Sequence, residues 1–384
     1  MNPAPRIPGA ASAGRAAPKA GRLLSLDAFR GITIAGMILV NTPGSWSYVY
    51  RPLGHAEWHG WTPTDLVFPY FLFILGVAIP FSFQRRLQEG ADRRDLFAHV
   101  VRRSLIIVAL GFLLRLFPDF HFSGMRWPGV LQRIGVVYLA AAGLYLAFGR
   151  RGRMAWTGGL LLGYWAVMTL VPVPGGTAGD LSPEGNLAAW VDRALMDGHL
   201  YRTTWDPEGI LSTFPAVTTS LLGIFTGEWL LSGRPSQTLT RGLLGAGAAL
   251  TPLGLAWGLV FPVNKALWTS SYVVFSAGTA LLVFGLVYWV VDVRRHRGPW
   301  LAPFLVYGTN AIAVFVLSGL MTRMLGRIYV GGAEGPSLYG WIYGNVFRPW
   351  AGDYNGSLAF AACYVLLWLA LMTPLYRRRI FIKV

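Results

Sequence analysis

Acid–base side chains gather in one short stretch of the chain, between residues 55 and 65. The segment GHAEWHGWTPTDLVFPYFLFILG holds His55, Glu57, His59 and Asp65. A histidine titrates near neutral pH, and a nearby carboxylate or amide can fix its orientation, so this set suits a general base. Asn41, in the upstream segment ILVNTPGSW, supplies such an amide. The residue types predict proton-transfer chemistry at a histidine of this stretch.

His55 and His59 also have the spacing of two ligands on one helical face, which raises the alternative of a zinc site. HAEWH differs from the HExxH motif because its acid stands at the wrong offset, and Gly60 follows at once. The single cysteine, Cys363, cannot form a CxxC site or an intrachain disulfide. We therefore predict no metal.

Asp65 has two interpretations that the spacing leaves open. The sequence TPTD before an apolar run is typical of a helix start, with Pro63 and Thr64 in the first-turn region, so Asp65 could be a helix cap. It could equally orient the imidazole of His55.

The composition predicts an all-α, polytopic membrane protein. Of 384 residues, 54% are hydrophobic and 13% charged, whereas soluble domains are about 25% charged. A spanning helix needs about 20 mostly apolar residues. About ten such spans are expected, near 26–43, 64–83, 99–117, 129–148, 154–172, 211–232, 241–261, 268–291, 302–324 and 356–375.

The basic residues form short clusters between the apolar runs, such as Arg85–Arg86 and the tail Arg377–Arg379. This distribution is typical of topology signals and argues against a nucleic-acid partner, despite a net charge of +16. With the clusters inside, both termini are expected in the cytoplasm. Residues 1–22 are predicted to be a disordered basic arm, and residues 23–384 a single transmembrane domain.

The long outer segments are 43–63, 173–210 and 325–355, which are rich in Pro, Gly and Trp. We expect them to pack as a cap over the helices, because Trp and Tyr favour the membrane interface. The stretch NLAAWVDRALMDGHL has helical periodicity and is predicted to lie along the membrane surface.

Ionisable groups inside spans are costly and are functional by default. Arg30 stands one turn after Asp27, which is also the spacing of a structural ion pair. Arg133 lies within a span, where an unpaired charge costs roughly 2.5–3.5 kcal/mol. It needs a partner, either an acid such as Asp27 or Asp65 or a ligand phosphate, and Gln132 beside it could share that role.

Two long segments carry a family resemblance. LDAFRGITIAGMILVNTPGSW followed by HAEWHGWTPTDLVFPYFLFILG resembles the heparan-α-glucosaminide N-acetyltransferase family, which includes bacterial NagX-type membrane proteins. GVLQRIGVVY, DPEGILSTFPAVTTSLLGIFTGEWL and YGTNAIAVFVLSG fit the same family. The resemblance spans roughly residues 23 to 376 and marks residues 23–384 as a transmembrane acyltransferase domain.

The resemblance implies transfer of an acetyl group from cytosolic acetyl-CoA to the amine of a small amino sugar on the periplasmic side of a bacterial inner membrane. The family's active-site histidine, asparagine and aspartate fall on His55, Asn41 and Asp65. His55 would be the general base or would carry the acetyl group itself, and both routes stay open. Asn41 would bind the developing oxyanion or the sugar.

Other residues are expected to bind the two substrates. The loop between Asn41 and His55 is longer here than in the family, which favours a small sugar over the end of a long polymer as the acceptor. Candidates for CoA are the cations Arg30, Arg102, Arg103 and Arg133 with Gln132, although a topology signal is an alternative for Arg102 and Arg103. Candidates for the sugar are Glu57, Trp58, Asp65 and Asn310, the last of which could instead bond between helices.

Two alternatives to amine acetylation remain at this point. One is O-acylation of a periplasmic glycan or lipid. The other is a solute transporter, against which stands the lack of any repeat relating the two halves. Membrane lipids are the expected surroundings, and a homo-oligomer is compatible with the family.

Overall fold

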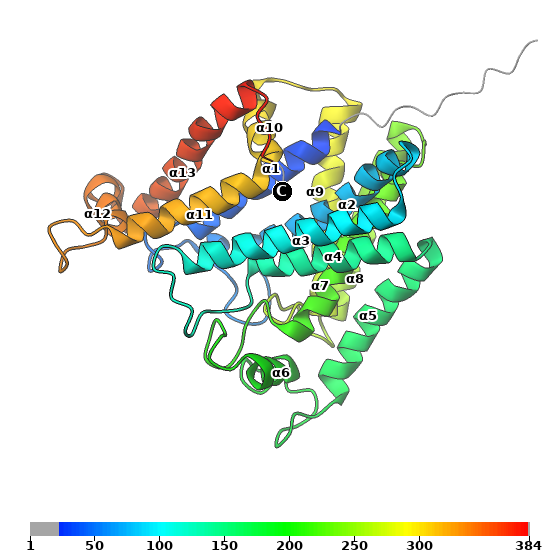
Figure 1. Cartoon of the computed structure of the whole chain (residues 1–384), viewed down its shortest axis with the longest axis horizontal. Helices are drawn as coiled ribbons and strands as arrows, with labels where there is room; N and C mark the ends of the chain where they lie inside the picture. Colours follow the sequence, from blue (N-terminus) through cyan, green and yellow to red (C-terminus); the bar gives the residue numbers. More distant parts are fainter. Residues whose placement is uncertain (1–22, 383–384) are drawn as a thin grey trace, which may run out of the picture.

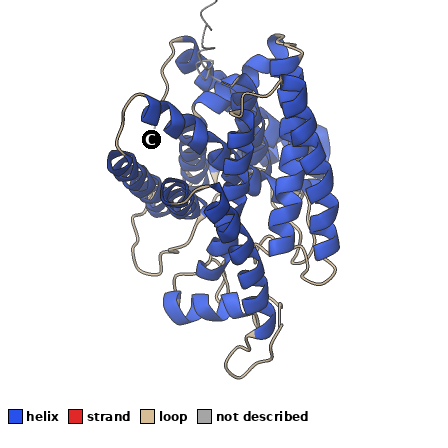
Figure 2. Ribbon diagram, turned by 90° about the vertical axis from the view of Figure 1, so that its right-hand side faces the viewer, coloured by secondary structure: helices blue, strands red, loops and turns tan. Residues whose placement is uncertain are grey.

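The computed structural model describes residues 23–382, and these residues form a bundle of helices (Figures 1 and 2). The predicted basic arm, residues 1–22, lies outside the described residues. The long helices of the first half are α1 (Leu24–Asn41), α2 (Val67–Gln88), α3 (Arg93–Leu116), α4 (Val130–Ala147), α5 (Arg150–Leu170) and α7 (Ile210–Leu230). The second half adds α8 (Ser236–Trp257), α9 (Ser270–Tyr288), α10 (Ala302–Thr309), α11 (Ala311–Arg327) and α13 (Arg348–Arg377).

The helices confirm the predicted all-α, multi-pass membrane fold. Each of the ten expected ranges coincides with a helix or with the pair α10 and α11. By length and composition, 7 helices among residues 23–382 can cross a membrane, and α5 and α8 are not among them. The count rises to 8 if α10 and α11 form one span. The expected number of about ten spans, and the cytoplasmic placement of both termini, stay predictions.

The expected span 302–324 is not one straight helix. The chain bends by 78° between α10 and α11, at Asn310, whose φ of −123° and ψ of 34° are not helical. The side chain of Asn310 donates to the Ile380 carbonyl (3.2 Å) and accepts from the Ile382 amide (2.8 Å). Asn310 therefore bonds neither to a facing helix nor, within the described residues, to the His55 region: it holds the C-terminal segment against the bend.

The predicted surface helix in the second outer segment is present as α6 (Leu187–Met196), at one end of the molecule (Figure 1). Asn186 caps it by accepting from the Ala189 amide at 2.8 Å. Its apolar side chains Leu187 and Ala188 are buried with Tyr164 of α5. The helix is thus anchored by packing onto the bundle and forms part of the expected cap.

Helices α2 and α7 cross with almost no side chain between them. A Cβ atom on Gly76 would lie 2.0 Å from the Ser220 backbone oxygen, and one on Gly223 would lie 2.2 Å from that of Phe73. Ser220 also donates its hydroxyl to the Leu72 carbonyl at 2.8 Å. Small residues allow this approach, as is common where membrane helices pack. The crossing fixes α2, which begins two residues after Asp65.

We expect Gly76→Ala to destabilise the protein by about 1–3 kcal/mol, because the added methyl group meets backbone atoms that cannot rotate away. Gly163→Ala in α5 is the matched control, since nothing lies within 4 Å of a Cβ at that position. The control is expected to be neutral or stabilised by up to about 1 kcal/mol. Thermal unfolding in lipid nanodiscs measures both, and equal melting temperatures for the two variants would contradict the close crossing.

Candidate active site

The imidazole of His55 and the carboxylate of Asp65 are in direct contact. His55 Nδ1 lies 2.6 Å from Asp65 Oδ1. His55 follows the short helix η1 (Arg51–Leu53) and its side chain is 45% exposed, whereas Asp65, in η2 (Pro63–Leu66), is 2% exposed. The structure thus combines a buried acid with an accessible base.

Both interpretations of Asp65 hold, because its two oxygens have different partners. Oδ1 faces His55, while Oδ2 accepts from the backbone amides of Ala56 and Thr62, each at 3.0 Å. The Thr62 bond is the capping interaction at the start of η2. The helix start therefore fixes the carboxylate that orients the histidine.

The contact also assigns the ring nitrogens of His55. An ionised carboxylate only accepts hydrogen bonds, so at 2.6 Å Nδ1 must carry the proton that lies between it and Asp65. The lone pair is then on Nε2. A neutral imidazole oriented in this way can remove a proton from a substrate held at Nε2.

Lys265 is a member of this site that the sequence reasoning missed. Its Nζ lies 3.4 Å from Asp65 Oδ1, and 3.0 Å and 3.5 Å from Nδ1 and Nε2 of His55. Burial lowers the pKa of Lys265 from its ordinary value, and the charge of Asp65 opposes that shift. A signal was present: Lys265 is the one lysine between residues 20 and 382, where every other basic side chain is an arginine.

A strained turn between α8 and α9 presents Lys265 to the site. Trp268 has a φ of 51°, which a bulky residue rarely adopts, and its buried indole donates to Thr219 Oγ1 at 3.1 Å. Asn264 closes the turn by accepting from the Leu267 amide at 2.8 Å. Because packing holds this backbone, the position of the Lys265 ammonium group is set by the fold.

Aromatic side chains of α9 and of the turn that precedes it contact the segment that holds Asp65. Tyr272 donates its hydroxyl to the Asp65 carbonyl at 2.5 Å, and Trp268 packs edge-on against both Tyr272 and Phe68. The guanidinium carbon of Arg133 lies 5.2 Å from the centre of the Trp268 ring. Arg133 is therefore close to the Asp65 end of the bundle.

Within residues 23–382, no acidic side chain is in hydrogen-bond contact with Arg133, so the acid that was one of its two expected partners is absent there. Its Nη2 donates to the Gly209 carbonyl at 3.0 Å and to the Ser212 hydroxyl, both at the start of α7. Its Nε and Nη1 are buried without a hydrogen-bond partner. Its contacts are instead the start of α7 and the Trp268 ring.

The other residues around His55 have separate contacts. His59 Nδ1 lies 3.3 Å from Asn264 Nδ2, so the two histidines have different partners. Trp58 donates its indole N–H to the Leu181 carbonyl at 2.8 Å, and Glu57 is exposed. Asn41 ends α1 with an exposed side chain and makes no hydrogen bond within residues 23–382.

The remaining predicted CoA contacts lie elsewhere. Arg30 pairs with Asp27 at 3.1 Å and donates to the Gly308 carbonyl, roughly 16 Å along α1 from Asn41. Arg102 is exposed, and Arg103, within α3, places its guanidinium carbon 4.9 Å from the centre of the Tyr138 ring with Nε buried and unpartnered. Gln132 packs against Gly111 of α3.

The chain is similar in sequence to one family of known proteins. Residues 22–254 match the family model described as heparan-alpha-glucosaminide N-acetyltransferase, catalytic, a range that includes His55 and Asp65 and ends before Lys265. A heparan-alpha-glucosaminide N-acetyltransferase of Homo sapiens is 33% identical over 77% of this chain and 52% of its own length. That of Mus musculus is 31% identical over 77% of this chain and 53% of its own. The chain thus spans about half the length of the curated relatives it matches.

Proposed function

Because the chain belongs to the heparan-α-glucosaminide N-acetyltransferase family, we propose that it is a transmembrane enzyme that acetylates an amino sugar from acetyl-CoA. The observation that carries the proposal is the contact between His55 and Asp65, which directs Nδ1 of an accessible imidazole to the carboxylate, so that in the neutral ring Nε2 is the proton acceptor. The acceptor is the amine of a small, glucosamine-like sugar.

The reaction needs one base and one site for negative charge. The sugar nitrogen attacks the thioester carbon, and His55 Nε2 takes the proton that the nitrogen loses. The carbon–sulfur bond then breaks, and the proton passes from His55 to the departing CoA sulfur. Free CoA and the N-acetylated sugar leave, and His55 returns to its starting state.

Lys265 is positioned to stabilise the charge that develops on the thioester oxygen. An amine that gives its proton to Nε2 lies within hydrogen-bond reach of it, and Lys265 Nζ is 3.5 Å from the same atom. A fixed cation beside the reacting carbonyl lowers the barrier more than a solvated one. Asn41, exposed at the end of α1, is the second proposed donor to this oxygen or to the sugar.

A small apolar cavity lies between helices near the site. It lies about one turn below the site, since Met37 precedes Asn41 by four residues and Phe68 follows Asp65 by three. Four helices line it, through Met37, Phe68, Phe71, Val130, Leu131, Ile134, Ile312 and Phe315. The uncharged arm of acetyl-CoA suits such a lining.

The CoA nucleotide is proposed to stay at the cytoplasmic face. Arg30, Arg102 and Arg103 are the cations proposed to meet its phosphates. Arg133 and Gln132, at the Asp65 end of α4, are left out of that group because Arg133 reaches Trp268 and α7 instead. With the sugar on the periplasmic side, the protein would reside in a bacterial inner membrane.

Purified protein with acetyl-CoA and glucosamine tests the proposal. Free CoA and N-acetylglucosamine are expected in equal amounts, measured by thiol assay and mass spectrometry. A product that is cleaved by mild base would be an ester and would place the enzyme among O-acyltransferases. CoA release at the same rate without any sugar would argue against acetyl transfer.

Lys265→Met is expected to lower kcat by about 10²–10³-fold, because it removes the cation beside the reacting carbonyl and keeps a stem of similar length. Lys265→Arg keeps the charge and should retain more activity than Lys265→Met. Steady-state kinetics with varied acetyl-CoA checks this, and its KM should change little. Equal kcat values for the Met variant and the unaltered protein would remove Lys265 from the mechanism.

A further inference from the structure

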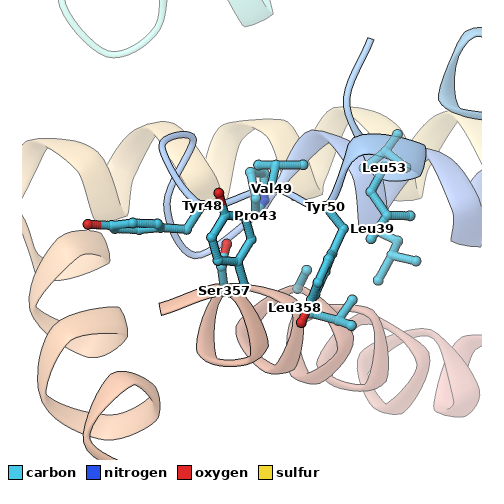
Figure 3. A pocket seen from close by; sticks show the side chains of 11 residues that line it. Leu39, Pro43, Tyr48, Val49, Tyr50, Leu53, Ser357 and Leu358 are labelled. Carbon is cyan, nitrogen blue, oxygen red and sulfur yellow. The ribbon is translucent and has the colours of Figure 1, made fainter. Parts of the chain in front are cut away.

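A pocket opens between the end of α1, the segment 43–53 and α13, and Figure 3 shows its side chains. We call it the tyrosine pocket, after the three tyrosines among its lining residues Leu39, Val40, Pro43, Tyr48, Val49, Tyr50, Leu53, Tyr354, Ser357, Leu358 and Ala361. In Figure 3 Tyr48 stands at one end, Leu39 and Leu53 at the other, and the ring of Tyr50 reaches between them toward Leu358. The loop between Asn41 and His55 builds one wall of this pocket.

The loop wall is fixed to α13 and to α12 (Leu338–Ile342) by hydrogen bonds. Gly44 N donates to the Ser357 carbonyl, and Ser45 N donates to Ser357 Oγ, each at 3.1 Å. Tyr339 of α12 donates its hydroxyl to the Pro43 carbonyl at 2.6 Å. These bonds tie the loop down at its start and fix the position of the pocket wall.

The lining has aromatic and aliphatic surfaces, hydroxyl groups and no charge. The Tyr354 ring lies 5.6 Å from that of Tyr48 and 5.4 Å from that of Tyr50, centre to centre. The hydroxyls of Tyr48 and Tyr354 make no hydrogen bond within residues 23–382, while Tyr50 donates to Asn355 Oδ1 at 2.6 Å. An uncharged ligand with one apolar face and several hydroxyls fits this lining, whereas a phosphate or sulfate would lack a cation among the lining residues.

The pocket lining includes residues that are neighbours of the candidate active site along the chain. Leu53 lines it and precedes His55 by two residues, a separation of at most about 7 Å. Leu39 and Val40 line it directly before Asn41. Thr62 donates its hydroxyl to the Gly54 carbonyl at 2.6 Å, which joins the pocket wall to the helix start that holds Asp65. The pocket wall and the loop that carries His55 are therefore parts of one connected segment.

We propose that the tyrosine pocket binds the pyranose ring of an uncharged amino-sugar acceptor, with the ring's apolar face on Tyr354 and its amine directed toward His55. This inference rests on the proposed function and adds the residues that select the acceptor. It makes the loop between Asn41 and His55 a determinant of which acceptor the protein binds. A lipid acyl chain is the competing occupant, and the test distinguishes it from a sugar.

Binding is measured by calorimetry in lipid nanodiscs, because alkyl glycoside detergents carry a sugar ring of their own. Both proteins carry His55→Ala, so that no turnover takes place, and one also carries Tyr354→Ala. Glucosamine is expected to bind about 5–20-fold more weakly to the Tyr354→Ala protein, since the stacked ring loses its aromatic partner. Ethanolamine, an amine without a ring, should bind equally to both.

Tyr329→Ala is the matched control, because Tyr329 is 49% exposed, close to the 46% of Tyr354, and does not line the pocket. It should leave glucosamine binding unchanged. Unchanged glucosamine affinity in Tyr354→Ala overturns the proposal, as does an equal loss for ethanolamine. If Tyr354→Ala weakens octylamine and spares glucosamine, the pocket takes an acyl chain instead. Weakened glucosamine binding supports the pocket even if the unaltered protein transfers no acetyl group, so the two ideas fail separately.

Discussion

His55→Ala is expected to lower kcat for acetyl transfer by about 10²–10⁴-fold, because it removes the only group proposed to take the amine's proton. The binding of acetyl-CoA should be nearly unchanged, since the His55 ring is largely exposed and is not part of the hydrophobic core. Initial-rate assays of N-acetylglucosamine formation measure the loss of kcat. Binding measurements with acetyl-CoA check that its affinity is unchanged.

His59→Ala is the matched control for that variant. It removes an imidazole from the same loop, but one whose polar contact is a 3.3 Å approach to Asn264. We expect its kcat to stay within about threefold of the unaltered value. If His55→Ala retains full activity, or if both variants lose it equally, His55 is not the base.

Asp65→Asn is expected to lower kcat by about 10²-fold or more with little loss of stability. The amide oxygen of Asn can still accept from Ala56 and Thr62, so the start of η2 should lose only about 1 kcal/mol. The amide nitrogen would then face His55 Nδ1, which favours the tautomer with its proton on Nε2. That tautomer cannot accept a proton from the substrate.

Asp65→Ala separates the two functions of this carboxylate. It leaves the amides of Ala56 and Thr62 without their acceptor and should cost about 1–3 kcal/mol of stability in addition to activity. Thermal unfolding and kinetics on both variants make the comparison. An Asn variant that is fully active would mean that Asp65 serves the helix start alone.

The helices could be predicted from the sequence because a run of about 20 apolar residues has few alternatives to spanning a bilayer. The bend at Asn310 could not, since the apolar pattern of YGTNAIAVFVLSG continues through it and contains no proline. The bend is stabilised by the segment Ile380–Ile382, about 70 residues further along the chain. A local pattern carries no information on such a contact.

The same limit applies to the site. The contact between His55 and Asp65 could be anticipated because ten residues and one helix start connect them. Lys265 comes from the α8–α9 turn, and only the packing of Trp268 and Tyr272 brings that turn to the site. Arg133 was expected to pair with an acid or a ligand phosphate, and among the described residues its contacts are the start of α7 and an indole face. Contacts between residues close in the sequence could be predicted from it, whereas contacts between distant residues depend on how the helices pack.

The central claim is that the acetyl group crosses the membrane while both substrates stay on their own sides. Proteoliposomes of one orientation, with carbon-13-labelled acetyl-CoA at the cytoplasmic face and glucosamine at the other, test it most directly. We predict labelled N-acetylglucosamine on the sugar's side only, and none from His55→Ala vesicles. Movement of unmodified glucosamine across the membrane at the same rate without acetyl-CoA, with no labelled product, would contradict the claim and identify a transporter.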